Sequence, residues 1–434
     1  MHFLKKFGKR ILQYEAKFIL KKYKPKIIAI VGSVGKTLTR ETIYLVLSKK
    51  FFVRKNEKSF TANLGIALTI IGYHQGVSTI LQFLKSLIFG FKLLIFNVHY
   101  PQVLILEIDV DNPGDLGRAF SLFSPDVLVM TAIGDVPSHV ELFNNTEDFL
   151  SEKRKYIKSL NKEVIVIYNA DDGAVSNILQ DLSLIKISCS IGSGYFDIKG
   201  SESVILYGNG KSGSMPIGMS FDIKYGMEVN SIKIFNSIGI SNEYACLLSY
   251  AVGIEFGLSR QEIIDSLNDY RVLQGRMRLI PGLSDSLLID DSYNSSPIAM
   301  EQAILVFAKL KCRGRKIAII GDMLELGRYS SLEHKKLAQL LKDVADNVIC
   351  VGLRSRRVYQ SLLFFGFNKL DVISVDTSKE AVVELQKILK SGDIVLVKGS
   401  QAMRMERILE KVMKHEEDKN QLLVRQESEW LSRT

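Results

Sequence analysis

The stretch Ile27-Ile28-Ala29-Ile30-Val31-Gly32-Ser33-Val34-Gly35-Lys36-Thr37 decides the fold of this 434-residue chain. A short apolar run breaks into a turn with two glycines, and residues 38–43 then have the pattern of a helix. Glycines let the backbone curl close to an anion, so that its N–H groups and the start of the helix point at phosphate oxygens. In such a loop Lys36 reaches the terminal phosphates and the Thr37 hydroxyl binds Mg²⁺. The pattern therefore predicts a buried strand that leads into a phosphate-binding loop.

This motif is shorter than the full P-loop pattern. Ile30 stands where that pattern has its first glycine, which leaves G-x-x-G-K-T. So short a motif also occurs by chance, in a strand, turn and helix with an incidental lysine. The rest of the chain must decide between these two interpretations.

Length and cysteine content indicate a multidomain protein of a reducing compartment. A chain of this length with 47% apolar residues is too long for one core and predicts two or three domains. The cysteines lie far apart, without the spacing of a zinc site or a disulfide framework. Because we also find no secretory signal, we expect a cytoplasmic protein, and we expect it to be a monomer. The cysteines are Cys189, Cys246, Cys312 and Cys350.

The net charge of +10 is concentrated at the N-terminus. Residues 1–26 carry nine Lys or Arg against Glu15 alone, and apolar residues recur among them at helical spacing. This pattern predicts a basic amphipathic helix over residues 1–25. The helix could lie on the anionic inner face of a membrane or pack on the body of the protein, and the sequence leaves both open. Nucleic acid is disfavoured as a partner because no recognition fold accompanies the charge.

Two further segments before the second strand have recognisable patterns. Residues 59–65 predict a polar turn that opens an apolar segment. Residues 77–99 are strongly apolar, but Lys85 and Lys92 interrupt them, so no run has the length of a membrane span. We expect a buried or interfacial pair of helices in residues 77–99.

Buried strands are predicted at residues 103–109, 127–131 and 164–168, with helices between them. This alternation predicts a parallel, doubly wound sheet that binds its ligands at the carboxyl ends of the strands. Glu107, Thr131 and Asn169 fall at such ends, and a carboxylate at Glu107 suits Mg²⁺. Short alternating segments in residues 190–235 predict antiparallel edge strands. Helical periodicity returns at 242–256 and 260–269.

A second α/β unit begins near Gln274, where strands and helices alternate again. The predicted strands are residues 287–290, 317–320, 347–351 and 394–397. The last twenty residues are polar, and no function is predicted for them. The fold class is therefore α/β, with a P-loop ATPase domain built on a mostly parallel doubly wound sheet and a Rossmann-like C-terminal α/β domain. The expected boundaries are 1–25 for the helix, 26–273 for the ATP-binding domain and 274–434 for the C-terminal domain.

These segments, in this order, resemble the Mur ligase family of ATP-dependent amide-forming enzymes. Within it they look most like the MurF type, which joins D-alanyl-D-alanine to a UDP-N-acetylmuramoyl-tripeptide in peptidoglycan precursor synthesis. The resemblance runs from about residue 26 to about residue 410. It rests on the loop 32–37, Glu107, Ser138-His139-Val140-Glu141, Lys153, residues 169–172 with Asn242, Gly275-Arg276-Met277-Arg278 with residues 290–294, residues 321–327, and Lys398-Gly399-Ser400 with Arg404.

The resemblance implies a role for each matched residue. ATP would bind to Gly32, Ser33, Val34, Gly35, Lys36, Thr37, Asn242, Arg276, Asp291 and Tyr293. Mg²⁺ would be held by Thr37, Glu107, His139 and Lys153, the last as a carbamylated lysine. The catalytic residues would be Lys36, Lys153, His139 and Arg276, and the acceptor substrate would meet Glu325, Lys398 and Arg404. His334 is a further acceptor-site candidate.

Without the resemblance, two of these residues would be interpreted differently. Lys153 would be a surface lysine in the charged helix Glu152-Lys153-Arg154-Lys155, and His139 would be a histidine in a turn. We also expect a departure from the family pattern, namely the absence of the N-terminal UDP-binding domain of the MurF type, because the P-loop starts close to Met1. Asp109, Asp111 and Asn112 replace the family's glycine and Asn-His pair.

Three functions therefore stay open. The leading prediction is a MurF-like ligase whose partners are a nucleotide-sugar or muramyl peptide and an amino acid or dipeptide. The second keeps the chemistry but changes the substrate, as in folylpolyglutamate- or cyanophycin-type ligases or a ligase that uses a lipid-linked muramyl peptide. The third is a non-catalytic ATP-binding scaffold recruited to a membrane.

Overall fold

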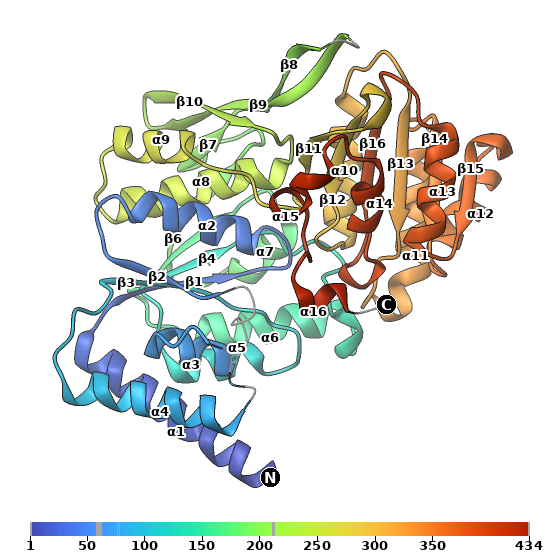
Figure 1. The fold of residues 1–434 in the computed structure, drawn as a ribbon. Coiled ribbons are helices and arrows are strands. Elements are labelled where there is room, and N and C mark those ends of the chain that lie inside the picture. Colours follow the sequence, from blue (N-terminus) through green and yellow to red (C-terminus); the bar gives the residue numbers. More distant parts are fainter. Residues whose placement is uncertain (1, 58–62, 76, 78, 211–212, 433–434) are drawn as a thin grey trace.

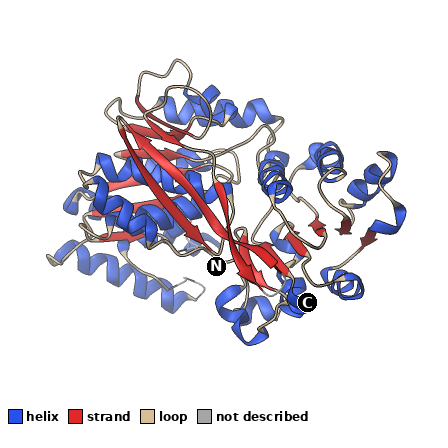
Figure 2. Cartoon of the chain, turned by 90° about the horizontal axis from the view of Figure 1, so that it is seen from above, coloured by secondary structure: helices blue, strands red, loops and turns tan. Residues whose placement is uncertain are grey.

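The computed structural model describes residues 2–57, 63–75, 77, 79–210 and 213–432. These residues form two α/β units that lie side by side, each with its own sheet (Figure 1). Helices surround the strands of both units (Figure 2). The turn expected at 59–65 begins outside the described residues.

The first sheet carries the phosphate-binding loop. Within the described residues it has ten strands in the order β10-β9-β7-β6-β5-β4-β1-β3-β2, with β8 paired to β9. The strands β1 to β6 are parallel, and β8, β9 and β10 form the predicted antiparallel edge. Their bounds are β1 Lys26–Val31, β2 Val53–Lys55, β3 Val103–Glu107, β4 Val127–Met130, β5 Ile165–Asn169, β6 Ile185–Ser190, β7 Ile198–Gly200, β8 Val204–Gly210, β9 Gly213–Tyr225 and β10 Glu228–Phe235.

Two layers of helices cover this sheet (Figure 1). One core lies under α1, α3, α4, α5, α6 and α7, and the other lies under α2, α8 and α9. Their bounds are α1 His2–Tyr23, α2 Lys36–Leu47, α3 Asn63–Ile71, α4 Ile80–Ile95, α5 Asp115–Leu122, α6 Thr146–Lys158, α7 Gly173–Leu179, α8 Ile240–Glu255 and α9 Arg260–Asn268.

The position of β1 explains why the loop after it is the functional loop. Ala29 packs into one core and Ile28 and Ile30 into the other, so the strand reads as an unbroken apolar run. Strand β1 lies between β3 and β4, where the order of the sheet reverses. Ligands of doubly wound sheets bind at the carboxyl end of such a switch point. Residues 32–37 follow there.

The second sheet has the order β11-β12-β16-β13-β14-β15, in which only β11 is antiparallel to its neighbour. The four predicted strands are present, and the short edge strands β11 and β15 were missed. The strands are β11 Arg278–Pro281, β12 Leu287–Asp291, β13 Lys316–Gly321, β14 Asn347–Val351, β15 Val372–Val375 and β16 Ile394–Lys398. The helices are α10 Pro297–Lys309, α11 Ser330–Leu341, α12 Arg356–Phe364, α13 Ser378–Ile388, α14 Glu406–Val412, α15 Lys419–Leu422 and α16 Ser428–Leu431.

The N-terminal helix is present and packs on the body. Leu12, Ala16 and Ile19 of α1 are fully buried in the first core. The prediction of a helix pair in residues 77–99 is wrong, because these residues form the single helix α4 and its partner is α1. Periodicity could not reveal a partner that lies some seventy residues away in the chain. Among the described residues, no helix combines the length and apolarity needed to cross a bilayer.

Candidate active site

The phosphate-binding loop depends on two glycines in the left-handed backbone region. Gly32 has φ 143° and Gly35 has φ 90°. A Cβ on Gly32 would lie 2.0 Å from Oγ1 of Thr131, so no larger residue fits there. Gly35 ends the loop at the first turn of α2. The loop therefore presents its backbone and a helix N-terminus to the same space, which is the arrangement that binds phosphate.

Lys36 and Thr37 connect this loop to the acids that follow β3. Lys36 Nζ donates to the Gly32 carbonyl at 2.9 Å and lies 3.2 Å from Asp109 Oδ1. The Thr37 hydroxyl donates to Glu107 Oε1 at 2.9 Å. Burial alone would lower the pKa of Lys36, but the charges of Asp109 and Glu107 outweigh burial and raise it. The Lys36 side chain therefore stays protonated and positively charged beside the loop.

The sequence interpretation missed Arg40, one turn further along α2. Arg40 is 2% exposed, and its Nη1 lies 3.0 Å from Glu107 Oε2. Burial raises the pKa of Glu107, and Arg40 opposes that shift. The spacing of Lys36 and Arg40, four residues apart on one helix, could have indicated a second cation near the phosphates.

His139 joins the two units. Its backbone is left-handed, with φ 62°. Its Nε2 lies 3.2 Å from Asp111 Oδ1, and its Nδ1 lies 3.0 Å from Glu325 Oε2 of the second unit. Burial would lower the pKa of His139, but the hydrogen bond to Glu325 and the charge of Asp111 raise it instead. An imidazole from one unit is thus held by an acid from the other.

Lys153 on α6 is buried, contrary to the surface position that its charged neighbours suggest. It is 5% exposed, and Nζ lies 3.2 Å from the ring centroid of Phe149. Its Nζ makes no hydrogen bond to any described residue. Burial lowers the pKa of Lys153 to about 7, so a large fraction of the amine is neutral near neutral pH. A neutral amine that lines a cavity can act as a nucleophile toward a small electrophile.

A cavity of about 630 Å³ lies between the two units. Such a volume is typical of small-molecule sites. It brings together most of the predicted site residues, from both units. Those that line it are Gly32, Ser33, Val34, Gly35, Lys36, Thr37, Glu107, His139, Lys153, Arg276, Tyr293, Glu325 and Arg404.

A smaller neighbouring cavity holds the other three predicted residues. Asn242, Asp291 and Lys398 line it, together with Gly35 and Arg276. Arg276 lies on both cavities, and its guanidinium stacks 4.0 Å from the ring centroid of Tyr293. The two cavities therefore form one site that runs from the phosphate-binding loop to the junction of the units.

Lys398 lies on a different side of this site from the one expected. Its Nζ is 2.7 Å from Asp291 Oδ2, and Asp291 Oδ1 accepts a hydrogen bond from the Met277 amide at 3.2 Å. Lys398 thus belongs with Asn242 and Asp291, and Glu325 and Arg404 line the larger cavity without it. The sequence motif identified Lys398 as a site residue. Its position beside Asp291 depends on the pairing of β12 with β16, which the motif does not reveal.

Two other groups of predicted residues lie outside these two cavities. Residues 169–172 line neither cavity of the site. Asp172 instead accepts hydrogen bonds from the amides of Ile133 and Gly134, both at 2.9 Å, so it stabilises a turn. His334 is fully buried, and its ring accepts from the Met323 amide at 3.1 Å. These are structural roles.

Comparisons with known proteins agree with this geometry. The Mur ligase middle domain is matched by residues 30–246, and the glutamate ligase domain of Mur ligases is matched by residues 275–401. The chain belongs to the Mur ligase family. The predicted family, fold class and enzyme class, a ligase, are thereby confirmed.

Relatives of this Mur ligase include two enzymes named UDP-N-acetylmuramoyl-tripeptide–D-alanyl-D-alanine ligase. That of Bacillus subtilis is 25% identical over 411 residues, which cover 92% of this chain and 78% of the relative. That of Rickettsia prowazekii is 25% identical over 405 residues, which cover 92% and 80%. The crystal structure of MurF ligase from Thermotoga maritima in complex with ADP has a TM-score of 0.74 at 22% identity, over 95% of this chain and 84% of that one.

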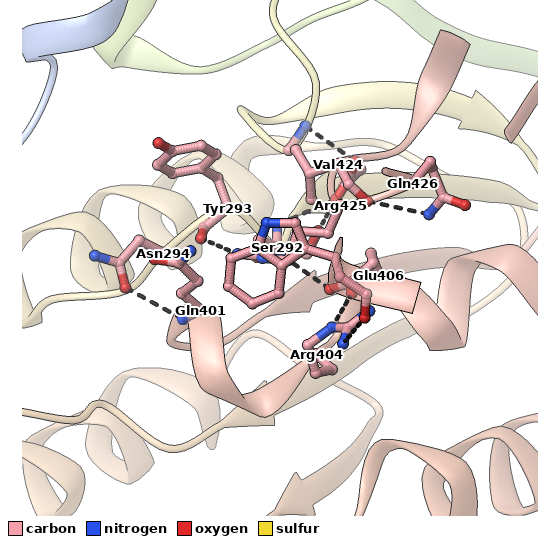
Figure 3. A network of polar contacts seen from close by, with 12 residues as sticks. Ser292, Tyr293, Asn294, Gln401, Arg404, Glu406, Val424, Arg425 and Gln426 are labelled. Atoms are coloured by element: carbon pink, nitrogen blue, oxygen red, sulfur yellow. Dashed lines mark hydrogen bonds and ion pairs between the residues drawn. The ribbon is translucent and has the colours of Figure 1, made fainter. Parts of the chain in front are cut away.

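The C-terminal segment of this Mur ligase, for which no function was predicted, forms part of the wall of the site (Figure 3). The chain's single tryptophan, Trp430, lines the larger cavity. Arg425 donates to the Tyr293 carbonyl and to the Ser292 carbonyl, the latter at 3.1 Å. Arg425 thus fixes the loop that carries the Tyr293 ring into the cavity. A single tryptophan in an otherwise polar C-terminal segment was the signal that could have indicated that this segment belongs to the site.

Glu406 is the centre of the same network. Its Oε1 accepts from Arg404 Nε at 2.6 Å, and its Oε2 accepts from Arg425 Nη1 at 2.8 Å. Glu406 is fully buried, and both arginines are nearly so. One carboxylate therefore compensates two buried guanidinium groups beside the cavity.

We expect Glu406→Gln to destabilise the protein by about 3 kcal/mol, because it removes the charge of the buried carboxylate that pairs with Arg404 and Arg425. Urea unfolding measures the loss. The matched control is Glu416→Gln, which breaks an exposed pair with Lys411 and should leave stability almost unchanged. Equal unfolding midpoints for the two variants would show that the network contributes no such stabilisation.

Proposed function

We propose that this Mur ligase is of the MurF type and uses ATP to join D-alanyl-D-alanine to the tripeptide carboxylate of a UDP-N-acetylmuramoyl-tripeptide. The names of the relatives in Bacillus subtilis and Rickettsia prowazekii support this substrate pair. One observation carries the chemistry: Lys36 of the phosphate-binding loop and Arg276 of the unit junction line the same cavity. The cavity therefore has one cation from the phosphate-binding loop and one from the unit junction that could act on the same phosphoryl group.

The reaction begins when the substrate carboxylate attacks the γ-phosphorus of ATP, which forms an acyl phosphate and releases ADP. The amine of the second substrate then attacks the acyl carbon, and the tetrahedral intermediate expels inorganic phosphate and forms the amide bond. Negative charge accumulates on the phosphoryl oxygens in the first step, so positioned cations lower its barrier. Lys36 and Arg276 supply the positive charge that stabilises these oxygens. Arg276 does so from the second unit as the units close.

Thr37 and Glu107 would hold a Mg²⁺ ion beside the phosphate-binding loop. The Thr37 hydroxyl donates to Glu107 Oε1 at 2.9 Å, and Glu107 Oε2 lies 3.0 Å from Arg40 Nη1, so the carboxylate is held beside the loop. Mg²⁺ commonly takes one or two protein oxygens and completes its shell with phosphate oxygens and water. When bound there, the ion would neutralise charge on the transferred phosphoryl group.

His139 and Lys153 would serve a second Mg²⁺, with Lys153 as a carbamate. Addition of CO₂ to the neutral amine releases a proton and creates an anionic oxygen ligand. The buried Nζ without a hydrogen-bond partner supports this role. His139 Nε2 already faces the carboxylate of Asp111, which could share such an ion.

The nucleotide is proposed to bind with its base and ribose toward Asn242, Asp291, Tyr293 and Lys398. The acceptor substrate is proposed to bind toward Glu325 and Arg404, which line the larger cavity. The domains are proposed to span residues 26–273 and 274–434. Residues from both of these domains form the site. The protein is proposed to work as a cytoplasmic monomer with peripheral membrane contact near residues 1–26.

A panel of substrates tests this function by the release of phosphate. We expect release only when UDP-N-acetylmuramoyl-tripeptide and D-alanyl-D-alanine are both present, and not with a folate and glutamate or with a cyanophycin primer and its amino acids. Phosphate release with a lipid-linked muramyl peptide, but not with the UDP-linked form, would instead assign a lipid-linked substrate. Nucleotide binding without phosphate release for any pair would identify a non-catalytic scaffold and refute the proposal.

A further inference from the structure

Helix α4 is apolar on two opposite faces, and only one of them is covered. Ser86, Gly90 and Leu93 are buried on its inner face. On the other side of the helix, large apolar side chains remain between 42% and 71% exposed, including those of an outer ridge at i, i+3 and i+4 spacing. The outer ridge consists of Ile80, Leu84, Ile88, Phe91 and Ile95. A helix with apolar residues on opposite faces normally buries both faces. We therefore expect the outer ridge to bind a partner.

The helix that carries the ridge is well fixed. At its N-terminus, the Thr79 hydroxyl accepts from the Gln82 amide, and the Gln82 side chain accepts from the Thr79 amide. At its C-terminus, Lys22 of α1 donates to three carbonyls of α4 and the residue after it, at 2.8–3.0 Å. Glycines let the two helices approach closely, because a Cβ on Gly90 would lie 2.4 Å from Glu15 Oε2. The ridge is therefore a preformed surface.

In residues 8–23, where its side chains are described, helix α1 turns most of its apolar residues inward. Its fully buried residues Leu12, Ala16 and Ile19 face the protein core. What α1 leaves exposed is mainly cationic, with Tyr14 and Phe18 among the charges. The exposed cations in residues 8–23 are Lys9, Arg10, Lys17, Lys21 and Lys22. The basic helix and the apolar helix thus have separate roles on one edge of the molecule, on the side opposite the second sheet (Figure 1).

Charge indicates which partner this edge fits. The chain has no Asp or Glu between Glu57 and Glu107, and α4 carries the exposed Lys85 and Lys92 beside its ridge. On α1 the one acid, Glu15, lies against Gly90. Apolar side chains bordered by lysines match a bilayer with anionic headgroups, because the side chains enter the acyl region and the lysines reach the phosphates.

A second copy of the chain fits this surface less well. A symmetric contact between two ridges would bring the cations of α1 and α4 toward their own copies, and the surface offers almost no acids to pair with them. We propose that the outer ridge of α4 inserts into an anionic lipid leaflet as an in-plane anchor, with the basic face of α1 providing electrostatic attraction. This inference does not rest on the ligase chemistry, and it moves the lipid contact from α1 to α4.

Co-sedimentation of the full chain with lipid vesicles tests the anchor. We expect binding to vesicles that contain phosphatidylglycerol, and weaker binding to pure phosphatidylcholine. Ile88→Ser/Phe91→Ser should weaken binding to the anionic vesicles about tenfold or more, because two large apolar side chains no longer enter the leaflet. The matched control is Phe364→Ser/Leu370→Ser, which removes two exposed apolar side chains from the second unit.

Circular dichroism and ADP affinity establish that both double variants are folded, and ligase activity on water-soluble substrates separates this test from that of the proposed function. Three results would overturn the inference. They are no binding of the wild type to anionic vesicles, equal binding of the two double variants, and a wild-type dimer that the α4 variant alone converts to a monomer. The last result would make the ridge an interface between copies.

Discussion

We expect Lys36→Ala to lower the rate of ATP turnover by about a thousandfold or more, which is the scale of losing a principal positive charge that acts on a transferred phosphoryl group. The structure gives two reasons. Lys36 Nζ donates to the Gly32 carbonyl inside the phosphate-binding loop. Residues 32–37 contain no other lysine that could replace it. Its removal also takes away the cation that lies 3.2 Å from Asp109 Oδ1, next to the same loop. Phosphate release with both substrates measures the loss.

The control for this variant is Lys26→Ala, at the opposite end of β1. Lys26 pairs with Asp126 at the surface, with a side chain that is 66% exposed. Its removal takes away one lysine from the same strand and loop unit, yet we expect turnover close to that of the wild type. If Lys36→Ala retains as much activity as Lys26→Ala, the loop does not bind the phosphates.

Lys153→Ala should lose ligation but keep ADP binding. The carbamate would hold a metal ion near the acyl phosphate, whereas the loop 32–37 holds the nucleotide independently. We expect a loss of at least about a hundredfold in ligation, the scale on which metal ligands or their supporting residues act. Added formate or acetate should restore part of the activity, because a small carboxylate can occupy the space of the missing carbamate.

Lys155→Ala is the matched control on the same helix, because Lys155 is exposed and two residues away. It should ligate normally and show no response to formate. Carbon-13 NMR of the wild type with labelled bicarbonate should show one carbamate signal that Lys153→Ala lacks. Wild-type ligation by purified Lys153→Ala would refute the carbamate.

The parts of the site that could be predicted are those encoded in short, continuous stretches. Strand β1 is buried on both faces, so its apolar run and the glycine turn after it are visible in the sequence. The order of the motifs then placed Glu107, His139 and Arg276 near the loop, as the cavity linings now show. Each of these residues sits at a strand end or an element boundary.

The parts that could not be predicted depend on contacts between distant segments. Lys398 meets Asp291 because β16 pairs with β12, and Arg425 fixes the Tyr293 loop from more than a hundred residues away. Residues 77–99 were predicted to be a buried or interfacial pair of helices, whereas they contain the single helix α4, which packs on α1 and leaves its outer ridge exposed. A residue pattern reveals which faces are apolar but not what covers them.

The most direct test of the central claim follows the oxygen atoms of the substrate carboxylate. The account requires that this carboxylate attack the γ-phosphorus of ATP in the cavity between Lys36 and Arg276, so one of its oxygens must leave with the phosphate. With an oxygen-18-labelled tripeptide carboxylate, mass spectrometry of the released phosphate should show one labelled oxygen in each molecule formed with the amide. Amide formation that releases only unlabelled phosphate would contradict the acyl phosphate route and the arrangement of the site built upon it.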